Sequence, residues 1–406
     1  MIKDLLGLTQ CPPDEVTVCG WVKTQRDMKS VVFLEINDGS CFANLQCTFT
    51  RTFNRDAGLS AETLDALSRA VTGAAVVITG RLVESPAAGQ KVELAASSLR
   101  VTGEAGADYP LQKKKHSLEF LREISHLRAR ANTFGAVARI RSRLSFAVHD
   151  FFQQRGFFYI HTPVITASDA EGAGAMFKVS ADIPGADGSA KPFFGRNAYL
   201  TVSGQLEAET YAMALSRVYT FGPTFRAENS NTARHLAEFW MIEPEAAFFT
   251  LEDDMALAED FIKSLLKTAL ANSADDLDFF NSRVQPGLID TLTSVAESAF
   301  THLTYTEAVA ELEKHAGQFE YKPFWGCDLQ SEHEKFLTET AVKGPVIVTD
   351  YPASIKAFYM KMNDDGKTVR AMDVLVPRLG EIIGGSERES DLQKLETRMQ
   401  TLGMDT

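Results

Sequence analysis

Five short strand-like runs between residues 15 and 103 restrict the fold of this chain more than any other feature. Apolar and polar residues alternate through much of these runs, and one helical pattern at residues 61–71 separates the third run from the fourth. Five strands with one helix fit an OB-type barrel, although the pattern alone also fits other small β-barrels. The runs span residues 15–23, 30–37, 43–49, 74–83 and 92–101.

The segment after these runs is polar and rich in turn-forming residues, and it carries the lysine run 113–115. Such a composition is typical of an interdomain hinge. We therefore expect a barrel domain of residues 1–105, a hinge of residues 106–120 and a second domain of residues 121–406. The lysines suit a solvated linker, and they also suit contacts with phosphates.

The second domain mixes helices and strands without a repeating βαβ period, so a doubly wound parallel sheet fits poorly. Apolar residues at three- and four-residue steps from Phe134 predict a long helix that ends at Gly156. Residues 251–344 predict further helices and contain no recognisable motif. These patterns indicate the α+β class. Neither a Walker-type nor a Rossmann-type glycine loop is present, so any ATP site must be built differently.

Charge and cysteine content limit the possible functions. A net charge of −13 argues against a protein coated for nonspecific nucleic-acid binding, although a local basic face can still hold RNA. The five cysteines form no Cys-x-x-Cys pair, which disfavours a zinc site or a disulfide framework. No run approaches the roughly 18 apolar residues of a membrane span, and the start lacks a signal-peptide pattern. We expect a cytoplasmic protein with no membrane partner.

The most informative stretch consists of two strand-like runs, 217–228 and 237–245, around a polar loop that contains His235. Arg226 lies at the end of the first run and Phe239 on the return run. A cation and an aromatic ring placed in this way can cradle a bent nucleotide, the charge facing phosphates and the ring facing the base. A charged β-hairpin without a ligand has the same pattern.

The residues of this stretch closely resemble motif 2 of class II aminoacyl-tRNA synthetases, in the form shared by the asparaginyl and aspartyl enzymes. The resemblance rests on Phe225-Arg226-Ala227-Glu228, on residues 231–236 and on Glu238-Phe239-Trp240. It implies an OB-fold anticodon-binding domain, an antiparallel-sheet catalytic domain and a homodimer formed through motif 1, the helix and strand that end at Pro163. Further matching segments are residues 20–22, 33–40, 121–128, 132–134 and 162–163.

The resemblance assigns the ATP site. Arg226 would be the catalytic residue, holding the amino-acid carboxylate and the α-phosphate, and Phe239 would stack on adenine. Glu228 and His235 would complete the ATP site, with His235 near the outer phosphates. A carboxylate that attacks phosphorus brings two anions together, so fixed cations must neutralise and align them.

Two acidic residues match those that hold Mg²⁺ in the family. Asp373 and Glu381 lie in two predicted strands joined by a turn. Carboxylates are the hard oxygen ligands that Mg²⁺ prefers, and the metal shields the polyphosphate. Without the resemblance, acids beside a surface turn would be the simpler interpretation.

The amino-acid site implied by the resemblance favours asparagine. Ala208 stands where the aspartyl enzymes carry a lysine that pairs with the substrate carboxylate. Glu209 would accept from the asparagine NH₂ group and repel aspartate, while Arg388 would donate to the carboxamide oxygen. Glu171, in a glycine-rich loop expected to close over the amino acid, and Gln205 would hold the α-ammonium group.

In the barrel, Phe33 and Gln46 match positions that stack on and hydrogen-bond the central uridine of the anticodon, and Arg26 lies near them. Stacking and exposed base edges are how single-stranded loops are recognised. By its pattern alone, Phe33 would be a core residue. The implied partner is the asparagine tRNA.

The chain ends at Thr406 after a predicted amphipathic helix capped by Ser390, whereas the family continues into motif 3, which we therefore expect to be absent. The sequence predicts an enzyme that joins asparagine to its tRNA through an asparaginyl-adenylate, using ATP and Mg²⁺. Two alternatives stay open. One is a truncated noncatalytic paralogue that binds tRNA or nucleotide, and the other is a relaxed enzyme that also charges aspartate.

Overall fold

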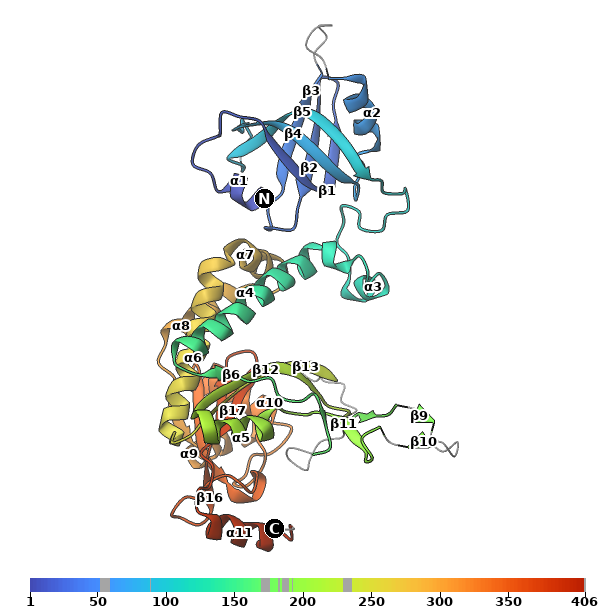
Figure 1. The fold of residues 1–406 in the computed structure, drawn as a ribbon. Helices are drawn as coiled ribbons and strands as arrows, with labels where there is room; N and C mark the ends of the chain where they lie inside the picture. The colour runs from blue at the N-terminus through green and yellow to red at the C-terminus, as the bar shows by residue number, and fades with distance from the viewer. Residues whose placement is uncertain are drawn as a thin grey trace. The chain divides into compact units, whose positions relative to one another are not determined.

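The computed structural model divides the chain into two compact units, each described by itself below. The first comprises Met1–Arg143 with Ala269–Ile289, and the second comprises Leu144–Thr268 with Asp290–Thr406. Figure 1 shows their helices and strands. The structure describes residues 1–51, 59–87, 89–168, 176–181, 183–184, 190–191, 193–228 and 236–404.

A closed five-stranded barrel forms most of the first unit, as the alternating pattern predicts. Its strands are hydrogen-bonded in the order β1-β2-β3-β5-β4, and β1 pairs with β4 to close the barrel. The β3–β5 pair is parallel and the other pairs are antiparallel. The strands are β1 (Val16–Asp27), β2 (Val31–Asn37), β3 (Leu45–Thr50), β4 (Ala75–Glu84) and β5 (Val92–Gly103), with α2 (Ala61–Arg69) between β3 and β4.

Alternate residues of these strands fill the barrel core. Val32, Leu34 and Ile36 of β2 are completely buried and pack with residues from the other strands. Two irregularities matter later. The register of β1 against β2 shifts between Val22 and Thr24, which leaves the intervening residue in a bulge, and a second shift in β4 occurs at Gly80.

The rest of the first unit is helical. An ion pair joins α4 to α7, because Arg139 Nη2 lies 2.6 Å from Asp276 Oδ1. Arg143 adds a hydrogen bond of 2.8 Å to the Ser273 hydroxyl. The helices are α1 (Ile2–Leu6), α3 (Leu118–Glu123), η1 (Arg128–Arg130), the first half of α4 (Asn132–Gln154) and α7 (Ala274–Arg283).

The second unit contains two main sheets, of order β13-β12-β6 and β14-β15-β16-β17. Most pairs are antiparallel, but β6 pairs with β12 and β14 with β15 in parallel. The strands are β6 (Phe158–Tyr159), β12 (Arg217–Phe225), β13 (Glu238–Ala246), β14 (Thr301–Thr304), β15 (Val346–Pro352), β16 (Thr368–Val376) and β17 (Gly380–Ser386), and smaller sheets are formed by β7 (Ile165–Thr166), β8 (Lys178–Val179), β11 (Ala198–Leu200), β9 (Ile183–Pro184) and β10 (Ala190–Lys191).

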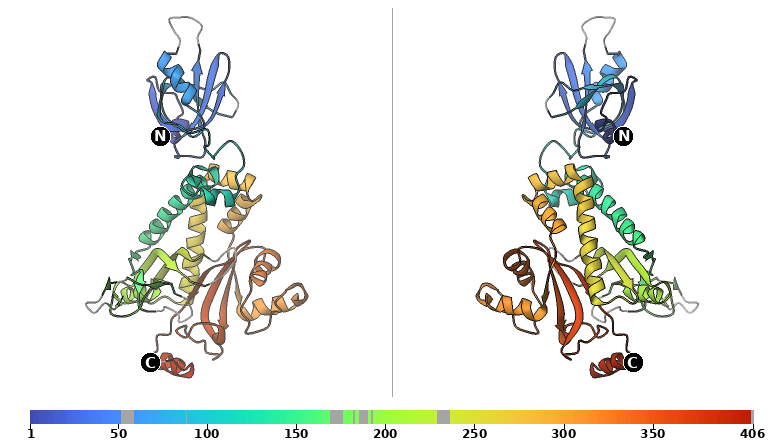
Figure 2. Two further views of the ribbon diagram at one scale, coloured as in Figure 1. Left: turned by 90° about the vertical axis from the view of Figure 1, so that its right-hand side faces the viewer. Right: turned by 90° about the vertical axis from the view of Figure 1, so that its left-hand side faces the viewer.

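Helices cover both faces of the four-stranded sheet, as Figure 2 shows for α6 on one side and α9 on the other. Ile347 of β15 packs in the cluster that contains Leu251 and Ile262 of α6, whereas its neighbour Val348 packs with Leu312 of α9. Successive side chains of β15 therefore point to opposite faces of the sheet and pack in two different hydrophobic cores. The helices are α5 (Gln205–Leu215), α6 (Leu251–Asn272), α8 (Leu288–Glu297), α9 (Tyr305–Glu313), η2 (Ala316–Gln318), α10 (Ser331–Phe336), η3 (Leu337–Ala341), η4 (Ala353–Ile355) and α11 (Leu392–Thr401).

Two sequence-based expectations need correction. Residues 251–344, expected to be helical, include β14, which joins the sheet through β15. The last helix is capped by Asp391 rather than Ser390, because the Asp391 side chain accepts from the Lys394 backbone N–H. Within the described residues, no helix is long and apolar enough to cross a membrane.

Candidate active site and anticodon surface

The β12–β13 hairpin places a cation beside an aromatic ring. Arg226 follows the end of β12, and its backbone N–H donates to Ala237 O at 3.1 Å. Its guanidinium carbon lies 5.4 Å from the centre of the Phe239 ring. Glu228 is exposed two residues further along. Two predicted site residues, His235 and Glu171, lie outside the described residues.

One face of β13 carries a row of functional side chains, because alternate residues of a strand point to the same side. Glu243 shares this face with Phe239 and anchors the start of α5. Its carboxylate accepts from the Thr220 hydroxyl at 2.8 Å and from the Gly204 N–H at 3.1 Å. A Cβ on Gly204 would lie 2.7 Å from Thr162 Oγ1, so this close approach requires glycine.

Of the four residues predicted to bind the amino acid, the three that the structure describes, Gln205, Glu209 and Arg388, lie together. Arg388 Nε donates to Glu209 Oε1 at 3.2 Å, and Gln205 Nε2 donates to the same oxygen at 3.0 Å. The structure adds two residues that the sequence reasoning missed. Glu245 of β13 accepts from Arg388 Nη2 at 3.3 Å, and the Tyr359 ring lies 4.8 Å from the guanidinium carbon. The even spacing of Phe239, Glu243 and Glu245, which places them on one face of a strand, was the available sequence signal for Glu245.

Burial controls the charges in this cluster. It raises the pKa of Glu245 from 4.5 to about 7, with Arg388 acting in the opposite direction and Glu209 adding to the rise. Burial also raises the pKa of Asp254, in α6, to about 6. The Asp254 carboxylate lies over Gly385, where a Cβ would come within 2.6 Å of Oδ2. Two carboxylates thus pair with one guanidinium while Asp254 lies within its electrostatic influence, so a further carboxylate from a ligand would be repelled.

Asp373 of β16 and Glu381 of β17 face the same space. A Cβ on Gly384 would lie 3.5 Å from Asp373 Oδ1 and 3.4 Å from Glu381 Oε1. Both oxygens of Asp373 also accept from Lys356 Nζ at 2.9 Å, a contact that no sequence pattern indicated. Two carboxylates that converge on one space suit Mg²⁺, which binds proteins through one or two carboxylates together with substrate phosphates. The described residues contain no group of three or more candidate metal ligands.

The three predicted anticodon residues form one surface on β1, β2 and β3. Arg26 and Phe33 are paired across the strands, with the guanidinium carbon 5.3 Å from the ring centre. Arg26 Nη2 donates to Gln46 Oε1 at 3.4 Å. Gln46 Nε2 donates to Glu93 Oε2 at 3.0 Å, which fixes the orientation of the amide. Phe33 is partly exposed, unlike its buried neighbours in β2, so it is not a core residue.

The comparisons with known proteins identify the family of the chain. Residues 117–406 match the family model of class II tRNA synthetases (D, K and N), and residues 16–102 match the OB-fold nucleic acid binding domain. Among curated relatives, the asparagine-tRNA ligase of Treponema denticola is 60% identical over 100% of this chain and 88% of the relative. That of Acetivibrio thermocellus is 54% identical over 96% of this chain and 84% of the relative.

Solved structures show the same fold. Asparaginyl-tRNA synthetase from Pyrococcus horikoshii, complexed with asparaginyl-adenylate, matches with a TM-score of 0.83 at 29% identity, covering 97% of this chain and 84% of that one. For aspartyl-tRNA synthetase from Entamoeba histolytica, the TM-score is 0.77 at 21% identity, covering 100% of this chain and 81% of that one, which is a likeness of fold alone.

The chain belongs to the class II tRNA synthetases of the D, K and N group, with an OB-fold domain followed by the class II catalytic domain. This finding confirms the predicted fold class. Within that group it belongs with the asparaginyl-tRNA synthetases and is an enzyme of the asparagine-tRNA ligase family.

Proposed function

We propose that this chain activates asparagine with ATP and then transfers the asparaginyl group to the terminal ribose hydroxyl of the asparagine tRNA. One observation carries the proposal. A single face of β13 joins the Arg226–Phe239 pair, which suits a nucleotide, to the Glu245–Arg388 pair, which suits a carboxamide. The high identity to asparagine-tRNA ligases supports the same reaction.

In the first step, a carboxylate oxygen of asparagine attacks the α-phosphorus of ATP, an anhydride bond forms and pyrophosphate leaves. Arg226 neutralises the two anions and keeps them aligned, and Phe239 stacks on adenine. Glu228 and His235 complete the nucleotide site. Positioning and charge are sufficient for this reaction, so no side chain needs to form a covalent intermediate.

Amino-acid selection depends on the cluster around Arg388. Glu209 accepts from the asparagine NH₂ group and Arg388 donates to the carboxamide oxygen, while Gln205 and Glu171 hold the α-ammonium group. An aspartate side chain would bring another carboxylate beside Glu209 and Glu245. That unpaired charge is the kind of penalty that discriminates strongly without editing.

Asp373 and Glu381 would hold Mg²⁺ at the space above Gly384. When bound, the metal shields the charge of the polyphosphate. Lys356 pairs with Asp373 and so supplies this buried carboxylate with a counter-charge.

We further propose that Arg26, Phe33 and Gln46 read the anticodon, with residues 1–105 as the anticodon domain, 106–120 as the hinge and 121–406 as the catalytic domain. A homodimer is supported by apolar side chains that lie exposed in the second unit. Phe146 of α4 is 75% exposed, Phe158 of β6 is 54% exposed and Met213 of α5 is 86% exposed. Surfaces of this kind are typical of interfaces between subunits.

Pyrophosphate exchange into ATP tests the proposal, with asparagine and aspartate in parallel reactions. We expect exchange with asparagine alone in the wild-type chain and none in Arg226→Ala. Arg100→Ala, a change at an exposed arginine of β5, serves as the control and should keep wild-type exchange. Exchange retained in Arg226→Ala would contradict the assignment. Exchange with both amino acids would favour a relaxed enzyme, and tRNA binding without exchange would favour a noncatalytic paralogue.

A further inference from the structure

A basic cavity of about 1000 Å³ lies in the first compact unit, apart from the anticodon residues. Strands β1 and β2, the connecting segment at residues 109–116, the start of α4 and the end of α7 contribute to its wall. Among the described residues, its wall contains seven lysines and arginines but a single acid, Glu35. The cations are Lys23, Lys113, Lys114, Lys115, Arg130, Arg139 and Arg283. This excess of positive charge on the cavity wall favours an anionic ligand, although the chain as a whole has a net charge of −13.

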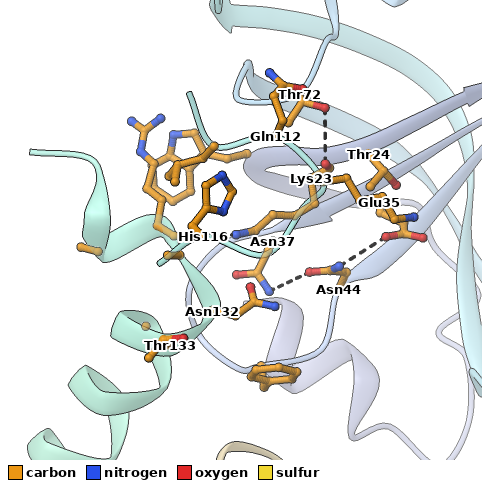
Figure 3. Close-up of a pocket in the computed structure, with 18 of the residues that line it drawn as sticks. Lys23, Thr24, Glu35, Asn37, Asn44, Thr72, Gln112, His116, Asn132 and Thr133 are labelled. Atoms are coloured by element: carbon orange, nitrogen blue, oxygen red, sulfur yellow. Dashed lines mark hydrogen bonds between the residues drawn. The ribbon is translucent and has the colours of Figure 1, made fainter. Parts of the chain in front are cut away.

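Lys23 is a partly buried cation of this wall, and a backbone irregularity places it there. It is the bulged residue of β1, which has no register partner on β2. A bulge re-aims a side chain, and such bulges are frequent beside functional sites. Figure 3 shows Lys23 extending into the cavity toward His116, with Asn132 and Thr133 of α4 nearby. Lys23 Nζ donates to Arg130 O at 3.0 Å.

The charge of Lys23 is poorly compensated. Burial lowers its pKa, and the neighbouring Arg139 and Arg130 lower it further. Arg139 already has a partner in Asp276, and the Arg130 guanidinium stacks on Trp21 with its carbon 5.4 Å from the ring centre. Within the part of the chain that the structure describes, neither Lys23 nor Arg130 forms an ion pair with a carboxylate. A partly buried cation without a counter-charge is destabilising, and an incoming phosphate would supply that counter-charge.

We propose that this cavity binds a phosphate of the tRNA backbone, as a contact separate from the anticodon and from the ATP site. RNA rather than a free phosphate is favoured by the exposed cations Lys113–Lys115 and Arg283, which extend the positive surface beyond the space that one phosphate fills. The exposed amide groups of Gln112 and Asn132 line the same wall and can donate to sugar or phosphate oxygens. This inference depends on the proposed function for one point, which is that the bound RNA is a tRNA.

The test measures binding of the asparagine tRNA to the full chain at several salt concentrations. Lys23→Met removes the buried charge, and Arg130→Gln removes an exposed one without disturbing the bulge. We expect weaker binding in both, with the salt dependence of log K reduced by about one unit of slope in each. The controls Lys3→Met and Arg100→Gln change exposed cations outside the cavity and should bind as the wild type does.

Asparagine-dependent pyrophosphate exchange, measured without tRNA, separates this inference from the proposed function. We expect wild-type exchange in all four variants. Normal exchange together with unchanged tRNA affinity and salt slope in Lys23→Met and Arg130→Gln would overturn the inference and leave the proposed function intact. Absence of exchange and of tRNA binding in the wild type would overturn both.

Inorganic phosphate, titrated calorimetrically into the wild type and Lys23→Met, tests the source of the phosphate group. Competition between phosphate and tRNA that disappears in Lys23→Met would support an RNA phosphate in this cavity. Phosphate that binds at Lys23 without displacing tRNA would show that the cavity serves a free phosphate, and it would overturn the assignment to RNA.

Discussion

Replacing Glu245 with glutamine should stabilise the protein at neutral and higher pH. The carboxylate is 15% exposed in the side chain and lies among Arg388, Glu209 and Asp254. Burial raises its pKa from 4.5 to about 7, so the folded state holds the proton more tightly than the unfolded state does. The stability that Glu245 contributes is complete below its unfolded pKa and is lost as the pH rises through about 7. Each pKa unit corresponds to about 1.4 kcal/mol, so the loss approaches about 3 kcal/mol at pH 8.

Glutamine has almost the same shape as the protonated glutamic acid and does not titrate. Glu245→Gln should therefore match the wild type near pH 4 and exceed it by about 3 kcal/mol near pH 8. Urea unfolding of both chains across this pH range measures the difference. Glu313→Gln, at an exposed glutamate of α9, controls for loss of charge alone and should change stability by less than about 0.5 kcal/mol. A difference between Glu245→Gln and the wild type that does not change with pH would refute the reasoning.

Three further predictions concern selectivity, the barrel and assembly. Glu209→Gln removes a charge that repels aspartate and should raise exchange with aspartate relative to asparagine by about tenfold or more; an unchanged ratio would count against a discriminating role. Gly80→Ala would place a Cβ 2.3 Å from Ala95 O and should destabilise the barrel by about 1–3 kcal/mol, as measured by urea unfolding. Gly103→Ala is the control, because its Cβ would lie 3.4 Å from the Ala75 Cβ, an ordinary contact distance, and should not destabilise the barrel. Phe146→Asp places a charge in the proposed dimer surface and should halve the mass measured by sedimentation; a wild-type mass of one chain would refute the dimer.

The barrel was predictable from the sequence because its strands are short apolar runs separated by turn-forming residues, and most of its core residues are apolar. The prediction failed at the far end of β1, which continues to Asp27 because Arg26 pairs with Phe33 on β2. A hydrophobic pattern does not indicate where a strand ends when its last residues are polar and face outward. The edge strand β14 was missed for a related reason, since it has four residues and pairs only with β15.

Some residues of the candidate site were predictable from the sequence and others were not. Residues of local motifs, such as Arg226 and Phe239, were found because they lie in one hairpin. Glu245 and Arg388 are 143 positions apart, and their contact exists only after two sheets have formed. The ion pair between Lys356 and Asp373 crosses 17 positions without any periodic signal. Contacts of this kind come from tertiary packing, which single-sequence patterns do not encode.

The row of side chains on β13 also bears on how such an enzyme can change through evolution. Phe239 and Glu245 are six positions apart, about 20 Å along an extended strand. Inserting or deleting one residue between them would turn one end of the row to the opposite side. Point substitutions at Glu209 or Glu245, by contrast, leave Phe239 untouched. Substitutions during evolution can therefore change which amino acid the enzyme selects and leave the nucleotide-binding residues unchanged. Such a change requires that the number of residues between Phe239 and Glu245 stays the same.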